Sequence, residues 1–163
     1  MNARTTARFA DRHATCAALE QLVQAGFPRD AISLVLSEDT HEREFGARQV
    51  GSGENTGARP MRASGVLATI VSGMVTLATP GGLTLRAAGP LATELLRRAS
   101  AGSGVFLRTT ALEAQGFTER EARFVAEGVR AGSIVVGVHG SDERVELAMR
   151  LLELSGGCAL EAA

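Results

Sequence analysis

The sequence predicts an α+β domain with a ferredoxin-like, split βαβ sandwich. Both ends of the 163-residue chain follow the order strand, helix, strand, and this length is enough for one domain with a sizeable core. Each end leaves an apolar strand face and an apolar helix stripe uncovered. Packing two helices on one face of a four-stranded sheet would bury these strand faces and helix stripes. We therefore expect one domain, β-α-β, then an inserted helical hairpin, then β-α-β.

The first βαβ half is expected over residues 1–37. Residues 5–11 alternate in part and then change period, which is typical of a strand followed by a helix. Asp11 is the expected N-cap of that helix and Gly26 its stop signal. The aliphatic run 31–37 is too short for a helix and predicts the second strand.

The middle of the chain predicts a flexible polar loop and then a Gly-rich helical insertion. Residues 38–62 are polar and have no sustained apolar period, so we expect the loop there. The insertion is expected over 63–116 and begins with an uncharged, small-residue helix over 63–79. The Pro-Gly-Gly sequence that follows would end this helix, and the Gly-Pro pair at 89–90 would start the second one.

Residues 117–163 predict a helix followed by the second βαβ half. Thr118 and Glu121 have the spacing of a capping box, which marks the start of the helix. Residues 133–140 form the clearest strand pattern of the chain, and a further helix leads to a short last strand from Cys158. In the ferredoxin-like order this last strand lies beside the first one and antiparallel to it.

Composition argues against nucleic-acid binding. The formal net charge is -1, the sequence pI is about 6.3, and all 17 basic residues are arginine. The chain has six Phe and neither Trp nor Tyr, so it offers few rings on which bases could stack. No hydrolase, metalloprotease or paired-carboxylate motif is found, and we expect a protein that is not an enzyme.

Three segments carry a resemblance to a known family: "FADRHATCAALEQLVQAGFPRDAISLVLSED", "LATPGGLTLRAAGPLATEL" and "LEAQGFTEREARFVAEGVRAGSIVVGVHGSDE". They resemble the bacterial general stress protein family that is typified by heat-induced stress proteins. The resemblance implies two ferredoxin-type halves around a Gly-rich helical segment, and a role connected with stress. It brings no catalytic residues and no cofactor.

Small residues in the predicted hairpin suggest a contact surface. We expect a non-enzymatic interaction protein that forms homo-oligomers through this hairpin, because small side chains let helices approach closely. Packing of the same residues within a single chain would account for the pattern equally well. The candidate interface residues are Gly65, Thr69, Gly73 and Thr76 on the first helix, and Gly89, Ala92 and Leu96 on the second.

A metal-binding or redox-responsive function is an alternative. His13 and Cys16 lie three residues apart at the start of the first helix, and the expected strand order brings Cys158 to the same end of the sheet. A thiolate and imidazole set of this kind would suit Zn or Cu(I), although cysteines are commonly small buried hydrophobic residues. His41 and His139 are expected at the surface.

Membrane association through residues 63–79 is a second alternative. A two-pass insertion is disfavoured because charged residues interrupt the segment that follows, namely Arg86, Glu94, Arg97 and Arg98. A phosphate loop is also disfavoured, since the Gly-rich stretches lack the Lys-Ser/Thr pair of a nucleotide site. With two cysteines and no pattern of a signal peptide, a cytoplasmic location is expected.

Overall fold

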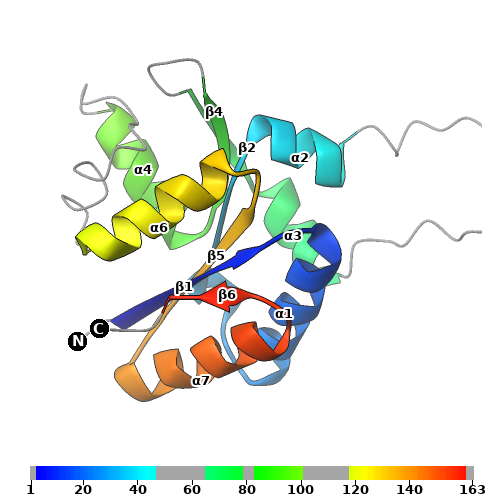
Figure 1. Ribbon diagram of the computed structural model, residues 1–163, viewed down its shortest axis with the longest axis vertical. Coiled ribbons are helices and arrows are strands. Elements are labelled where there is room, and N and C mark those ends of the chain that lie inside the picture. The colour runs from blue at the N-terminus through cyan, green and yellow to red at the C-terminus, as the bar shows by residue number, and fades with distance from the viewer. Residues whose placement is uncertain (1–2, 47–64, 79–82, 101–117, 161–163) are drawn as a thin grey trace, which may run out of the picture.

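The computed structural model describes residues 3–46, 65–78, 83–100 and 118–160. They form one six-stranded sheet with the strand order β3-β4-β2-β5-β1-β6, in which all neighbouring strands are antiparallel. Helices cover both faces of this sheet (Figure 1). The strands are β1 (Ala3–Phe9), β2 (Ile32–Ser37), β3 (Val75–Ala78), β4 (Thr84–Ala88), β5 (Ile134–Gly140) and β6 (Cys158–Ala159). The helices are α1 (Arg12–Gln24), the 3-10 turn η1 (Arg29–Ala31), α2 (Glu38–Phe45), α3 (Gly65–Ser72), α4 (Pro90–Ser100), α6 (Glu119–Arg130) and α7 (Asp142–Leu154).

Four of the strands join the two ends of the chain. Strand β5 lies between β1 and β2, so that Val136 faces Ala7 on one side and Leu34 on the other. The helix α1 connects β1 to β2, and α7 connects β5 to β6. The expected antiparallel pairing of the last strand with the first is confirmed, with Cys158 opposite Arg8.

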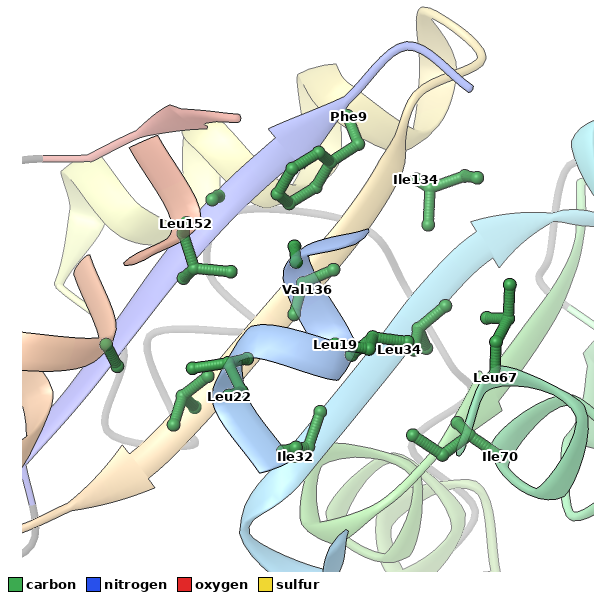
Figure 2. Close-up of a cluster of buried hydrophobic side chains, with 14 of the residues drawn as sticks. Phe9, Leu19, Leu22, Ile32, Leu34, Leu67, Ile70, Ile134, Val136 and Leu152 are labelled. Atoms are coloured by element: carbon green, nitrogen blue, oxygen red, sulfur yellow. The ribbon is translucent and has the colours of Figure 1, made fainter. Parts of the chain in front are cut away.

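The core on one face of the sheet packs against α1, α3 and α7. Phe9 and Val136 extend from the sheet towards Leu19 and Leu22 of α1 and Leu152 of α7 (Figure 2). All five side chains are buried, and each contributes about 1.5–3 kcal/mol of hydrophobic free energy relative to an exposed position.

A second core fills the space between the opposite face and the helices α4 and α6. Val35 and Val135 pack there with Leu91 of α4 and with Val125 and Val129 of α6. All six residues of β2 are buried, because helices cover this strand on both sides. The sequence predicted helices on one face of a four-stranded sheet, and the structure adds a second helical layer and two further strands.

The predicted helical hairpin is wrong over much of its length. The first helix ends at Ser72 instead of continuing to residue 79, and Val75–Ala78 forms β3. A second strand, Thr84–Ala88, pairs with it, and Leu77 and Leu85 are buried opposite each other. These residues alternate between inward and outward positions, which is the period of a strand. The expected start of a helix at Pro90 is confirmed.

The predicted polar loop is also wrong at its beginning. Glu38–Phe45 forms α2, whose N-cap residue Ser37 accepts a hydrogen bond from the backbone N–H of Thr40. Acidic residues in the first turn interact favourably with the helix dipole. The rest of that loop, the Pro-Gly-Gly sequence and the part of the insertion after Ser100 lie outside the described residues.

The helix starts that the sequence marked with caps are confirmed. The Asp11 carboxylate accepts a hydrogen bond of 2.9 Å from the backbone N–H of Ala14 at the start of α1. Thr118 and Glu121 form a complete capping box at the start of α6. These local signals depend only on neighbouring residues, which explains why they could be recognised without the tertiary structure.

Candidate interaction surface

Strand β3 forms one edge of the sheet. Within the described ranges only β4 pairs with it, so its outer backbone N–H and C=O groups face away from the sheet. Thr76 and Ala78 are exposed, whereas Leu77 is buried. Natural edge strands are usually protected by charged residues or proline, and Val75–Ala78 contains neither. This edge therefore has the chemistry that accepts a further strand.

The helix that leads into β3 presents small, uncharged side chains on its outer side. Leu67 and Ile70 of α3 point into the core (Figure 2). The exposed residues of α3 and the turn after it are Gly65, Ala68, Thr69, Ser72 and Gly73. A Cβ atom added at Gly65 would meet no atom of the described residues within 4 Å, so this glycine serves no close approach between them.

The second group of predicted interface residues lies mainly inside the chain. Gly89 has a φ of +81°, and a Cβ atom there would collide with the carbonyl oxygen of Ile32, so the glycine serves the close approach of two backbone segments. Ala92 lies on the buried side of α4 and packs in the second core. Leu96 is 38% exposed. The seven predicted residues thus do not form one surface, and only the first four gather around α3 and β3.

The predicted metal ligands are divided between the two faces of the sheet. Cys158 lies opposite Arg8, whose side chain contacts α6, and directly opposed residues project to the same face. His13 and Cys16 belong to α1 on the other face, where Cys16 Sγ lies 3.7 Å from Glu20 Oε1. In the described part of the chain, no three His, Cys, Asp or Glu side chains are grouped so that they could hold a metal ion.

A polar cluster links the first turn of α6 to the sheet. Arg4 forms an ion pair of 3.5 Å with Glu121, and His139 lies opposite Arg4 in the β1–β5 pairing. His139 is half-buried, and its buried Nδ1 has no hydrogen-bond partner among the described residues. Burial lowers the pKa of His139, and the charge of Arg4 lowers it further. His139 was expected at the surface and is only partly exposed, because the first turn of α6 lies near this end of β5.

A second ionic cluster attaches α2 to β4. Arg86 donates two hydrogen bonds to the carboxylate of Glu38, at 2.6 and 2.9 Å. These bonds lower the pKa of Glu38 and raise that of Arg86. Burial lowers the pKa of the half-buried His41, and the neighbouring Arg86 adds to this effect. No sequence motif indicated this cluster, because its partners are far apart in the chain and depend on the unpredicted β4.

The membrane alternative lacks a suitable helix among the described residues. None of these helices has both the length and the apolar character that a bilayer crossing requires. The segment proposed for this role contains α3, which has eight residues, and then continues as a strand.

The chain was also compared with known proteins. No model of a protein family matches it, and no curated protein or solved structure does so either.

Proposed function

We propose that this chain is a non-enzymatic, cytoplasmic, stress-associated interaction protein that assembles with copies of itself through the edge strand β3. The observation that carries the proposal is the exposed and uncharged edge formed by Val75–Ala78. The association with stress rests on the resemblance of the three sequence segments quoted above to general stress proteins.

We further propose that the body of the protein is a ferredoxin-like fold. The strand order β6-β1-β5-β2 supports this assignment, as do the connections through α1 and α7 on one face. In this description β3, β4, α4 and α6 are additions to the basic fold. The strands β3 and β4 extend the sheet beyond β2, and the helices α4 and α6 cover its second face.

The partner that suits the β3 edge best is a second copy of the same strand. Two identical strands pair antiparallel about a two-fold axis, and each then supplies the hydrogen-bond groups that the other lacks. All pairs within the sheet are already antiparallel, so such a dimer would continue the same geometry across the interface. The small exposed residues of α3, such as Gly65 and Thr69, would leave room for the approaching copy.

The test is the native mass of variants measured by light scattering. We expect the wild type to be a dimer or a higher oligomer, and Thr76→Lys to shift it towards the monomer because each copy would then carry a charge on the shared edge strand. Thr93→Lys is the matched control, since Thr93 is exposed on α4. A monomeric wild type, or a Thr76→Lys protein that keeps its assembly, would refute the proposal.

A further inference from the structure

A pocket of about 380 Å³ lies between α6 and the edge formed by β1 and the end of β6. This is the opposite edge of the sheet from β3, so the pocket is separate from the proposed assembly surface. Its volume is at the lower end of the range that is usual for small-molecule sites. The lining residues are Arg8, Glu119, Arg120, Arg123, Phe124, Glu127 and Leu160.

Arg8 is held in a fixed position at this pocket. Its Nε donates a hydrogen bond of 2.9 Å to the carbonyl oxygen of Phe124, and Nη2 donates to the same oxygen. The guanidinium carbon lies 3.8 Å from the centroid of the Phe124 ring. Gly128 leaves the necessary space, because a Cβ atom there would lie 2.8 Å from Arg8 Nε. A glycine inside a helix costs about 1 kcal/mol relative to alanine, and the position of Arg8 explains its presence.

The charges in the lining are only partly paired. Arg123 forms an ion pair of 2.7 Å with Glu119 on the same helix. Glu127 lies 3.6 Å from Arg8 Nη2, but its side chain is 59% exposed, so this ion pair is weak. Arg120 has no ion-pair partner among the described residues. Three arginines and two glutamates leave the lining with an excess of positive charge.

We propose that this pocket binds a small organic anion, a carboxylate or a phosphate, with Arg120 and Arg8 as its charged donors. Guanidinium groups bind both kinds of anion through paired hydrogen bonds. Because Phe124 already holds Arg8 in place, binding costs little of this side chain's conformational freedom. Leu160 offers an apolar contact for the body of the ligand.

The proposal is tested by NMR titration of the ¹⁵N-labelled full chain at constant ionic strength. One series uses inorganic phosphate and a second uses hexanoate, while the amide signals of α6 are followed. We expect saturable shifts with a Kd below about 1 mM for at least one of them. Arg120→Gln should weaken binding about tenfold. Glu127→Gln should tighten it, because this change removes a carboxylate that repels the anion and partly neutralises the charge of Arg8.

Arg150→Gln is the matched control, since Arg150 is exposed on α7, across the sheet from α6. Its binding should equal that of the wild type. Saturation by phosphate alone supports a phosphoryl ligand, and saturation by hexanoate alone supports a carboxylate with an apolar tail. Shifts that do not saturate with either probe overturn the proposal. Equal affinities of the wild type and Arg120→Gln, in a protein whose spectrum remains folded, overturn it as well.

Discussion

Arg4 and His139 face each other across the β1–β5 pairing, and Glu121 of α6 forms an ion pair with Arg4 above them. Protonation of His139 would therefore place a second positive charge beside Arg4 in a half-buried position. The backbone of Ala31 and the carboxylate of Glu121 favour the protonated form, but burial and Arg4 outweigh them. Protonation of His139 is therefore less favourable in the folded protein than in the unfolded chain.

We expect the free energy of unfolding to decrease as the pH falls from 7 towards 5. The pKa of His139 in the folded protein lies below its ordinary value of 6.5, so the unfolded chain takes up the proton first. This contribution to stability is complete above the unfolded pKa and is lost progressively as the pH falls towards the folded pKa. Urea unfolding at several pH values measures the effect.

His139→Gln should reduce this pH dependence. His41 also has a lowered pKa, so part of the slope should remain in that variant. If His139→Gln has the same slope as the wild type, His139 is not the coupled group.

Gly128→Ala should destabilise the protein by about 1–3 kcal/mol, although alanine is normally the better helix former. The added Cβ atom would lie 2.8 Å from Arg8 Nε, and the hydrogen bonds to the Phe124 carbonyl keep Arg8 from moving aside. In an Arg8→Ala background the same change should become stabilising. Chemical denaturation of the four proteins of this double-mutant cycle gives the coupling. A stabilising effect of Gly128→Ala in the wild-type background would contradict the expectation.

Arg86→Ala should destabilise the attachment of α2 to β4 by about 1 kcal/mol, because it removes both hydrogen bonds to Glu38. The loss should shrink as the pH falls. The pKa of Glu38 is lower in the folded protein than its unfolded value of 4.5, so its contribution to stability is complete above pH 4.5 and decreases as the pH falls below it. Arg86→Lys should recover only part of the loss, because an ammonium group does not reproduce the paired geometry. Full recovery by lysine would show that charge alone matters. Thermal or urea denaturation of the variants measures these differences.

Cys158 should react with a thiol reagent before Cys16 does. Cys158 is exposed on β6, whereas Cys16 is half-buried and packs against the core beside Glu20. Mass spectrometry of the peptides after brief alkylation distinguishes the two sites. Cys16→Ser and Cys158→Ser assign the fast phase, and the expectation fails if the fast phase survives in Cys158→Ser.

Local signals in the sequence were sufficient for much of the fold. Asp11 and the Thr118 capping box marked helix starts, because a cap is recognised from its neighbours alone. The aliphatic runs of β2 and β5 were recognised as strands. Their nearly unbroken apolar character was also the available sign that helices cover them on both faces, but only one covered face was predicted.

The errors arose where several short signals competed. Residues 75–78 are uncharged like the helix before them, and a strand of four residues gives too few alternations to be distinguished from a helix. The predicted metal ligands are not brought together, for a different reason. Cys158 was placed at the correct edge of the sheet, but its face depends on its pairing with Arg8, and a shift of one residue would have reversed it.

The central position of β5 has a consequence for how the chain is made. Strands β1 and β2 do not pair with each other, and both find their shared neighbour only in residues 134–140. On the ribosome, β1 therefore waits for its neighbour β5, whereas β2 can pair earlier with β4. Pairings between such distant segments close slowly. In the interval the edge of Ile32–Ser37 that later pairs with β5 stays open to other chains, which favours aggregation during synthesis.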